Sequence, residues 1–490
     1  MPAHDSPELS ATTSPVIPSA GDARIAACMR AAGQSEAAIL GFLGAVDRVR
    51  RGARGFLPEA SIEPVASLPR LADFQSRNPT EPDVPGDDAL LRQLVVFKLN
   101  GGLGTGMGLD GPKSLVPVRS GATFLDFIVR QILHLRQRTG GEVPAFCLMN
   151  STATRRQTLD ALSRFSGLGD PAEMDFIQST VPKLDPATLE PAVWPADPEM
   201  EWCPPGHGDF YPSLLACGLL DRFLERGIRY AFVSNSDNLG ATVDLDLLRY
   251  FADQDLPFVM EVAERTAADR KGGHLARSLA DGRLLLRESA QCPAADEASF
   301  QDISRHRFFN TNNLWIRLDA IRDLLRCQGG TLSLPLITNV KTVDPRDPAS
   351  PKVLQLESAM GAAIGEFDRS AAVVVPRSRF APVKATVDLL ALRSDAYRVT
   401  GDHRLVLVES RDGRPPVVDL DSVHYKFLPD FEALFPGGAP SLIGCDGLKV
   451  RGRVRFEPGV TCVGSVEFSR ESEGTGTVVA GVYRDQRVTV

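Results

Sequence analysis

From about residue 90 onward, short apolar runs alternate with longer segments whose apolar residues recur at helical spacing. The short runs predict strands at Val95–Leu99, Pro144–Met149, Asp175–Ser179, Tyr230–Ser234, Pro257–Val262, Arg283–Glu288, Phe309–Ile316 and Ala371–Val375. The longer segments predict helices at Thr123–Arg138, Arg155–Phe165, Pro212–Arg226, Leu245–Asp253, Ala320–Cys327 and Val353–Phe367. Because strands and helices alternate, we expect an α/β domain with a mixed, largely parallel sheet that binds ligands beyond the carboxyl ends of its strands.

The chain before this region has a different pattern. Residues 1–21 are rich in Ser, Pro, Thr and Ala and lack the basic and apolar regions of a secretory signal, which predicts a disordered tail. Residues 22–89 predict a helical segment and a connector. The helical segment consists of two helices around Gly33, with Ser35 as a plausible N-cap. The connector, at 55–88, is rich in Pro and acidic residues, and we expect little regular structure there.

The last part of the chain has a six-residue period. Leu448, Val454, Val460 and Val466 form one apolar series, and a second series consists of Val450, Phe456, Cys462 and Phe468. A six-residue period is typical of a β-helix, in which each short strand stacks its apolar residues on the next coil. The alternative is an ordinary set of twisted hairpins. We therefore predict a main domain at 90–400 and a C-terminal β-helix domain at 401–490.

Composition narrows the class of partner. The chain has 490 residues, 24% of them charged, and a net charge of −8, which argues against a nucleic-acid or anionic-membrane partner but leaves room for a local basic cleft. No apolar run reaches the roughly 18 residues that span a bilayer. The eight cysteines form no C-x-x-C pair, which indicates reduced thiols, mostly in the core, and a cytoplasmic protein. The seven histidines lack the spacing of a zinc site.

A glycine-rich stretch follows the first predicted strand. Six glycines lie between Gly101 and Gly111, and Pro112 and Lys113 come next. Glycine lets backbone amides approach phosphate oxygens, and lysine adds a positive charge. The Walker A and dinucleotide-binding templates do not fit, because Lys113 follows a proline and the glycines do not open directly into a helix. We interpret the stretch as a loop for a phosphorylated ligand; a flexible surface turn is the alternative.

Two further segments place polar side chains where a ligand would meet them. His207 lies between two glycines in WCPPGHGDFYP, just before a predicted helix, which favours contact with an anion or a sugar over a structural role. Asp237 follows a predicted strand in FVSNSDNLG. A carboxylate at the carboxyl end of a strand is well placed to bind Mg²⁺ that bridges phosphates. The alternative for Asp237 is that it caps the next turn.

Amides and cations characterise two more segments. Asn310 and Asn312 alternate in FFNTNNLW, where amides would recognise sugar hydroxyls or a uracil edge; an Asn-rich turn is the alternative. Arg377, Arg379 and Lys384 lie beside two prolines in PRSRFAPVKAT. Such a loop is usually solvated, but in an acidic protein with a phosphate-type loop we favour a second cation clamp for a polyphosphate.

These segments closely resemble one family. KLNGGLGTGMGLDGPKSL, LMNS, PPGHGDFYPSL, NSDNLGA, FNTNNLW, VLQLESAMGAAI and VPRSRFAPVKATVDLL are similar, in order, to segments of the UTP–glucose-1-phosphate uridylyltransferases (UDP-glucose pyrophosphorylases) of the type typical of eukaryotes. The resemblance covers roughly residues 90–400. It implies a GT-A-like nucleotidyltransferase domain followed by a left-handed β-helix. One departure is Glu-Ser-Ala-Gln at 288–291, where Glu-Ile-Ala-Gln is expected.

The resemblance also implies residue roles, with UTP and glucose 1-phosphate as substrates and Mg²⁺ as cofactor. The nucleotide would be bound by Leu99, Asn100, Gly101, Gly102, Lys113, Gln178, Gly206 and Lys384. The sugar phosphate would be bound by Gly101, Gly102, His207, Asn235, Ser236, Asp237, Glu288, Asn310 and Asn312. Asp237 would be the metal ligand, and Lys113 and Lys384 would be catalytic.

Other functions remain to be weighed against this one. A related enzyme would use galactose 1-phosphate or N-acetylglucosamine 1-phosphate, although His207 in PPGHGD favours an unsubstituted hexose. A regulator that binds sugar nucleotides without turnover would need to have lost Lys113, Asp237 or Lys384, and all three are present. A homo-oligomer formed through the C-terminal β-helix is compatible with the sequence.

Overall fold

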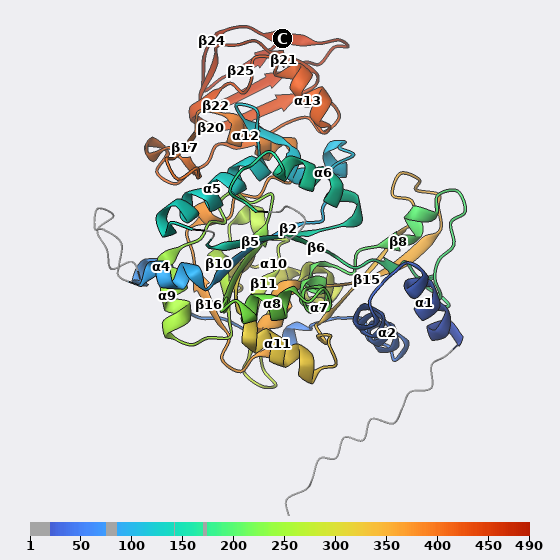
Figure 1. Ribbon diagram of the computed structural model, residues 1–490. Coiled ribbons are helices and arrows are strands. Elements are labelled where there is room, and N and C mark those ends of the chain that lie inside the picture. The colour runs from blue at the N-terminus through green and yellow to red at the C-terminus, as the bar shows by residue number, and fades with distance from the viewer. Residues whose placement is uncertain (1–19, 75–85, 142, 170–173) are drawn as a thin grey trace, which may run out of the picture.

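We describe residues 20–74, 86–141, 143–169 and 174–490 of the chain from a computed structural model (Figure 1). Within these ranges the largest sheet has ten strands and is mixed. Four of its strands run parallel and lie side by side: β9 (Tyr230–Asn235), β2 (Leu94–Asn100), β5 (Ala145–Asn150) and β6 (Asp175–Ile177). The carboxyl ends of these strands therefore meet at one edge of the sheet, as the alternating pattern predicts.

The rest of the large sheet is mostly antiparallel. Strand β13 (Phe308–Arg317) pairs with β9 and with β10 (Phe258–Glu264), and β10 pairs in parallel with β16 (Ala371–Val374). The far side is formed by β11 (His274–Ser278), β12 (Leu284–Arg287) and β1 (Ile62–Pro64). The structure therefore confirms a mixed α/β fold. Its largest group of parallel strands is β9, β2, β5 and β6, next to the glycine-rich segment.

Helices cover both faces of the sheet, because β2 is apolar on both sides. Val96 packs in one cluster with α5 (Phe124–Thr139) and α9 (Leu245–Asp253). Val95 and Phe97 point the other way. They pack with α7 (Phe210–Ala216), α8 (Leu219–Glu225) and α11 (Leu318–Cys327). Figure 1 shows α5 and α6 (Thr152–Leu162) above the sheet and α7, α8 and α11 below it.

Some predicted elements differ from the structure. The helix predicted at Val353–Phe367 is wrong: β15 (Lys352–Ser358) pairs with β14 (Leu336–Thr342), and a 3-10 turn follows at Met360–Glu366. The apolar residues at the start of this segment fit a strand as well as a helix, and Gly361 and Gly365 make a helix less favourable. The helix predicted at Pro212–Arg226 is broken at Gly218, whose φ is 74°.

The N-terminal segment is more ordered than expected. Helices α1 (Ala20–Ala31) and α2 (Glu36–Arg50) confirm the predicted pair, and the Ser35 side chain caps α2 by accepting from the Ala38 amide at 3.2 Å. The connector contains β1, which joins the large sheet, and α3 (Leu71–Phe74), and α4 (Asp87–Arg92) begins at its end. The expectation of little regular structure there is therefore wrong for the residues that the structure covers. Residues 75–85 and most of the tail predicted at 1–21 lie outside those residues.

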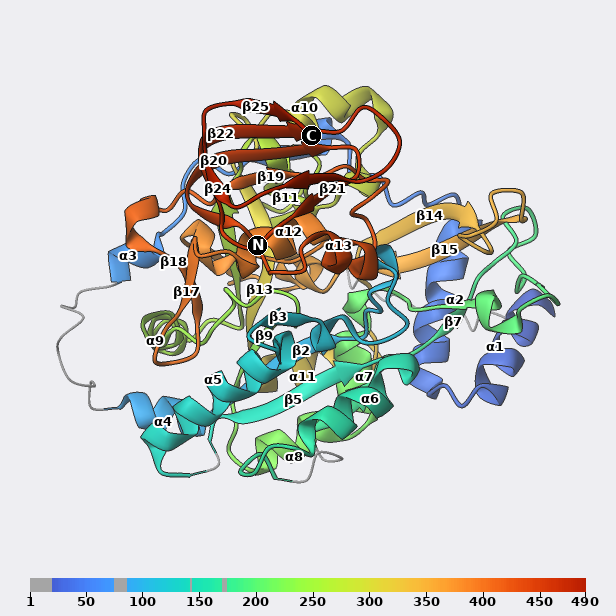
Figure 2. The same ribbon diagram turned by 90° about the horizontal axis from the view of Figure 1, so that it is seen from above.

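The C-terminal part consists of small sheets in which the strands run parallel. Strand β20 (Ser441–Arg451) pairs with β19 (Val417–Asp419) and β22 (Val460–Ser469), and β22 pairs with β24 (Gly481–Arg484) and β25 (Arg487–Thr489) (Figure 2). A second pair joins β21 (Val454–Phe456) to β23 (Gly476–Val478). All eight residues of the two predicted apolar series are buried. The predicted periodicity is therefore a true core pattern; the left-handed coil and the domain boundaries stay predictions.

Three smaller elements join these parts. Strands β17 (Tyr397–Val399) and β18 (Leu405–Leu407) form a hairpin, and α12 (Thr386–Arg393) and α13 (Leu428–Leu434) pack beside the C-terminal sheets.

The eight cysteines are all free thiols: four are buried, two are half-buried and two are exposed. In the part of the chain covered here, no helix is long and apolar enough to cross a bilayer.

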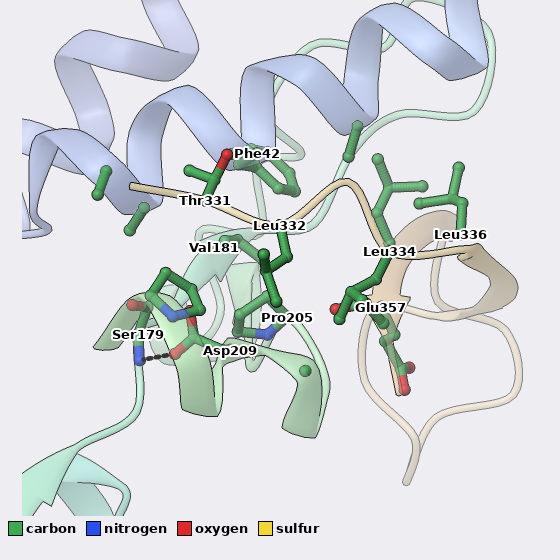
Figure 3. A pocket seen from close by; sticks show the side chains of 18 of the residues that line it. Phe42, Ser179, Val181, Pro205, Asp209, Thr331, Leu332, Leu334, Leu336 and Glu357 are labelled. Carbon is green, nitrogen blue, oxygen red and sulfur yellow. Dashed lines mark hydrogen bonds between the residues drawn. The ribbon is translucent and has the colours of Figure 1, made fainter. Parts of the chain in front are cut away.

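The N-terminal helices cover a small cavity of about 80 Å³ (Figure 3). Phe42 of α2 lies on one side of it, and Pro205 and Asp209 lie on the other. One carboxylate oxygen of Asp209 accepts from the Ser179 amide at 2.7 Å and from the Ser213 hydroxyl at 2.6 Å. Burial raises the pKa of Asp209 from 3.8 to about 6, so the folded state favours the neutral acid more than the unfolded state does.

We expect the substitution Phe456→Ala to lower the free energy of unfolding by about 3–5 kcal/mol, because it leaves a cavity in a packed core. Phe456 is 1% exposed, and its ring lies 4.8 Å from that of Phe435 and 5.2 Å from that of Phe468. Urea unfolding followed by circular dichroism would measure the change. The control is Val482→Ala, at a residue that is 65% exposed, for which we expect a change within about 0.5 kcal/mol. Equal losses in the two variants would contradict this packing.

We expect Asp209→Asn to raise the free energy of unfolding at pH 7 by about 1–3 kcal/mol. The pKa of Asp209 is higher in the folded state, so its contribution to stability is complete below pH 3.8 and is lost as the pH rises through about 6. An amide oxygen can accept both existing hydrogen bonds without this loss. Unfolding measured between pH 4 and 7 should therefore show a flatter loss of stability in the variant. The exposed Asp323→Asn serves as the control, and an unchanged pH profile in Asp209→Asn would refute the assignment.

Candidate active site

A cavity of about 460 Å³ brings together side chains from several strand ends. Asn235 ends β9 and Asp237 follows it, Asn310 and Asn312 lie in β13, and Glu288 follows β12. His207 and Lys384 complete this group of predicted residues. Residues that are far apart in the sequence therefore meet in one cavity, as expected for the predicted sugar-phosphate site.

A second group lies on the glycine-rich side. The Gln178 side-chain amide donates to the Gly206 carbonyl at 2.9 Å, and a side-chain carbon at Gly101 would lie 2.9 Å from the Gln178 oxygen. Gly206 has φ of 82°, and a side-chain carbon there would lie 2.4 Å from the Ser358 carbonyl. Gly206 is thus needed for close approach, whereas a side chain at position 101 would displace the end of the Gln178 side chain. Gly206 precedes His207, so this group adjoins the cavity.

Other predicted residues hold the strand ends together. Asn100 is 2% exposed, and its side-chain nitrogen donates to the Asn150 side chain at 2.7 Å and to the Thr158 hydroxyl at 2.9 Å. Its side chain is therefore engaged in the core and does not line the cavity. The buried Ser236 donates its amide to the Leu99 carbonyl at 3.1 Å.

The two predicted charged groups of the nucleotide and metal site form an ion pair with each other. Lys113 Nζ lies 2.7 Å from Asp237 Oδ2, and each side chain is 18% exposed. The Lys113 amide also donates to the Gly102 carbonyl at 3.3 Å, which closes the glycine-rich loop. The other carboxylate oxygen, Asp237 Oδ1, is buried and has no hydrogen-bond partner among the residues covered. A buried oxygen without a partner costs free energy unless a cation or a donor reaches it.

His207 faces the cavity as a neutral donor. Its Nδ1 accepts from the Met360 amide at 2.9 Å, so the proton of the neutral ring lies on Nε2. Burial lowers the pKa of His207 from 6.5 to about 4, and the ring is therefore uncharged at neutral pH. The cavity thus contains a hydrogen-bond donor that adds no charge.

The amides of β13 are held in a fixed arrangement. Asn312 has φ of 59°, and its side-chain nitrogen donates to the Asn235 side chain at 2.9 Å. The Asn310 side-chain oxygen accepts from the Asn312 amide at 2.8 Å. The side-chain oxygen of Asn312 is buried without a partner in the part of the chain described. These neutral groups suit recognition of hydroxyls.

The basic loop differs from the expected clamp of three cations. Arg377 makes two hydrogen bonds to Asp269, at 2.6 and 2.8 Å, and Arg379 makes two to Glu261, also at 2.6 and 2.8 Å. These carboxylates neutralise both arginines, which sequence spacing does not reveal. Lys384 Nζ has no ion pair or hydrogen bond within the ranges covered, so Lys384 is the cation of this loop that remains for a ligand.

Sequence reasoning missed Lys271, Gly272 and Gly273, which also line the cavity. A side-chain carbon at Gly273 would lie 2.4 Å from a carboxylate oxygen of Glu288, so a larger residue there would push the Glu288 carboxylate out of its place. Burial raises the pKa of Glu288. Lys271 is exposed at the cavity and has no ion pair with another described residue. The signal was a lysine next to two glycines, as in the longer loop.

Comparison with known proteins identifies the family. The family model for UTP–glucose-1-phosphate uridylyltransferase matches residues 57–462. The chain is 40% identical to that enzyme from Solanum tuberosum over 435 residues, which is 88% of each chain. It is 42% identical to the Saccharomyces cerevisiae enzyme over 384 residues, which is 78% of this chain and 75% of the yeast one.

Solved structures agree with this result. A UDP-glucose phosphorylase from Trypanosoma brucei has a TM-score of 0.87 and 50% identity, covering 96% of this chain and 100% of the other. A variant of Leishmania major UDP-glucose pyrophosphorylase in complex with UDP-glucose has a TM-score of 0.88 and 47% identity, with the same coverage. The predicted motifs, the cavity they form and these similarities lead to one conclusion: the chain belongs to the UTP–glucose-1-phosphate uridylyltransferase family.

Proposed function

We propose that this chain transfers the uridylyl group of UTP to glucose 1-phosphate, giving UDP-glucose and pyrophosphate in a reversible reaction. The observation that carries the proposal is the cavity in which His207, Asp237, Glu288, Asn312 and Lys384 meet beside the glycine-rich loop. The family membership and the length of the match support the same activity.

The reaction follows from the charges of its substrates. A phosphate oxygen of glucose 1-phosphate attacks the α-phosphorus of UTP, and the bond from that phosphorus to the pyrophosphate oxygen breaks, so that pyrophosphate leaves in line. The attacking phosphate is already ionised at neutral pH, so no general base is needed. The task of the protein is to align two polyanions and to neutralise charge as it develops. We assign that task to Lys113 and Lys384.

We assign the nucleotide to the loop side of the site. Leu99, Asn100, Gly101 and Gly102 would hold the nucleotide through their backbone. Gln178 would recognise the uracil, because its side chain lies beside Gly101 and is fixed by its hydrogen bond to Gly206. Lys113 would bind the triphosphate.

We assign the sugar phosphate to the cavity. Asn235, Ser236, Glu288, Asn310 and Asn312 would recognise the glucose hydroxyls. His207 would donate from Nε2 to the sugar phosphate, which a neutral ring does equally well throughout the physiological pH range. Lys384 would reach the phosphates from the opposite loop.

The residues present fit a magnesium ion at Asp237. Its Oδ1 is buried without a partner, which is the position a cation would fill. Among the described residues, no cluster of three or more His, Cys, Asp or Glu side chains is arranged to hold a metal ion. Mg²⁺ bound through one or two carboxylates, with waters and substrate phosphates as its remaining ligands, needs no such cluster. When bound, Mg²⁺ would neutralise charge on the triphosphate.

The finer features of the architecture are proposals as well. A GT-A-like domain at 90–400 would precede a left-handed β-helix at 401–490, with the N-terminal segment at 22–89. Support for the coil comes from the pairing of Leu448 with Val466, because the 18 positions between them correspond to three six-residue repeats. A homo-oligomer would form through the outer face of this module, and the free thiols favour a cytoplasmic protein.

The direct test is pyrophosphate release from UTP and glucose 1-phosphate, measured with and without Mg²⁺. We expect release that requires the metal and that is much slower with other nucleoside triphosphates. Galactose 1-phosphate and N-acetylglucosamine 1-phosphate test the choice of sugar. Faster release with either of them would assign a different substrate, and no release with any combination would reject the enzyme.

We expect Lys384→Ala to lower kcat by more than about tenfold, because it removes a positive charge from the developing transition state. The circular dichroism spectrum and the Tm should stay those of the wild type, since Lys384 Nζ has no partner within the described ranges. Lys352→Ala is the matched control, because Lys352 is an exposed lysine of β15 outside the cavity. Wild-type turnover in Lys384→Ala would contradict the assignment.

A further inference from the structure

A buried ion pair lies behind the cavity without lining it. Glu261 of β10 is fully buried, and the Arg379 side chain is 9% exposed. Two hydrogen bonds join them, from Arg379 Nη2 to Glu261 Oε1 at 2.6 Å and from Nε to Oε2 at 2.8 Å. Trp315 and Asn313 also donate to the carboxylate, at 2.9 and 3.0 Å, so each oxygen accepts two hydrogen bonds. Glu261 is therefore fully satisfied by groups of the protein.

Arg379 connects this pair to both loops of the site. It lies five positions before Lys384, and its Nη2 donates to the carbonyl of Thr242 at 2.9 Å. Its own carbonyl accepts from the side chains of Asn238 and Asn313, at 3.1 and 3.2 Å. Asn238 directly follows Asp237. The arginine thus bonds to the loop that carries Asp237 while belonging to the loop that carries Lys384.

The two loops are also joined directly. The Asp237 carbonyl accepts from the amide of Val383 at 3.1 Å, and the side-chain oxygen of Asn238 accepts from the amide of Ala381 at 3.0 Å. These bonds fix the backbone on both sides of the cavity. Buried Lys98 of β2 also donates to the Ser234 hydroxyl at 2.8 Å and to the Ala241 carbonyl at 2.7 Å. The loop that carries Asp237 is therefore held both by β2 and by the loop that carries Lys384.

Stability alone does not explain a buried ion pair of this kind. Desolvation of two charges offsets most of their attraction, and apolar residues of similar volume often stabilise a fold as well or better. What the ion pair adds is directional bonding, because a guanidinium group donates in a fixed geometry. The bonds that it organises run between the two catalytic loops and to β10.

We propose that Glu261 and Arg379 are positioning residues that set the location of Lys384 relative to Asp237. The inference rests on the proposed function, in which Lys384 and Asp237 act on the same polyphosphate with charges of opposite sign. Neither Glu261 nor Arg379 touches a substrate. Their contribution is to turnover, because a misplacement of about 1 Å at reacting groups costs on the order of a hundredfold in rate.

The test uses the double variant Glu261→Gln/Arg379→Met, which removes both charges together. A single substitution would leave a buried charge without its partner and endanger folding. We expect the double variant to fold, to keep KM for both substrates within about threefold, and to lose more than about tenfold in kcat. Wild-type kcat in the folded double variant would overturn the proposal.

A second ion pair provides the control for stability. Arg249 of α9 lies 2.8 Å from Asp87 of α4, and the Asp87 side chain is 4% exposed. Within the described residues, neither side chain forms a hydrogen bond or ion pair with the two loops, so Arg249→Met/Asp87→Asn should lower the Tm without changing kcat. An equal loss of kcat in this control would overturn the proposal by showing a general effect of destabilisation.

Hydrogen exchange gives a readout that does not depend on activity. In Glu261→Gln/Arg379→Met the amides of Ala381 and Val383 should exchange faster than in the wild type, because they bond across the two loops. Amides in the centre of β2 should keep their protection. Unchanged exchange at Ala381 and Val383 would overturn the proposal. Absence of turnover in the wild type would instead count against the proposed function, and the exchange experiment would still test the positioning of the two loops.

Discussion

The parallel pairing of β9, β2, β5 and β6 is the constraint on which the site depends. Parallel strands end at the same edge, so the glycine-rich segment after β2 and the Asp237 segment after β9 leave the sheet side by side. Polar side chains at these ends are then held by hydrogen bonds: the buried Asn100 bonds to Asn150, and the half-buried Asn235 bonds to Asn312 of the neighbouring β13. Because backbone pairing fixes the strand ends, short loops suffice to bring charged groups within a few ångströms.

Charge is distributed sparingly around the cavity. Arg377 and Arg379 are each neutralised by a carboxylate, and burial keeps His207 uncharged. Lys113 is paired with Asp237. A site with many free cations would hold phosphates strongly in every state, whereas catalysis requires interactions that strengthen as charge develops. Most positive charges of this site are thus committed to the protein, which leaves Lys384 and Lys271 exposed to a ligand.

The sequence was sufficient for much of this architecture, for identifiable reasons. Apolar runs such as Val95–Leu99 and Phe309–Ile316 are long enough to mark buried strands, and polar residues at their ends mark the edge where ligands bind. The helix predicted at Val353–Phe367 failed because pairing with β14 outweighed the local apolar spacing. Local pattern also cannot reveal which cations are neutralised, since Arg379 and Glu261 are 118 positions apart.

The C-terminal module shares one continuous hydrophobic cluster with the catalytic sheet. Val96 of β2 and Phe468 of β22 belong to it, together with Tyr425 and Leu389. The hydroxyl of Thr386, two residues after Lys384, donates to the Tyr425 carbonyl at 2.5 Å. The module is therefore not an independent appendage. Over evolutionary time its strands are free to diverge on their outward faces, but the side facing α12 must change together with the loop that carries Lys384, so this module cannot be exchanged freely between otherwise similar proteins.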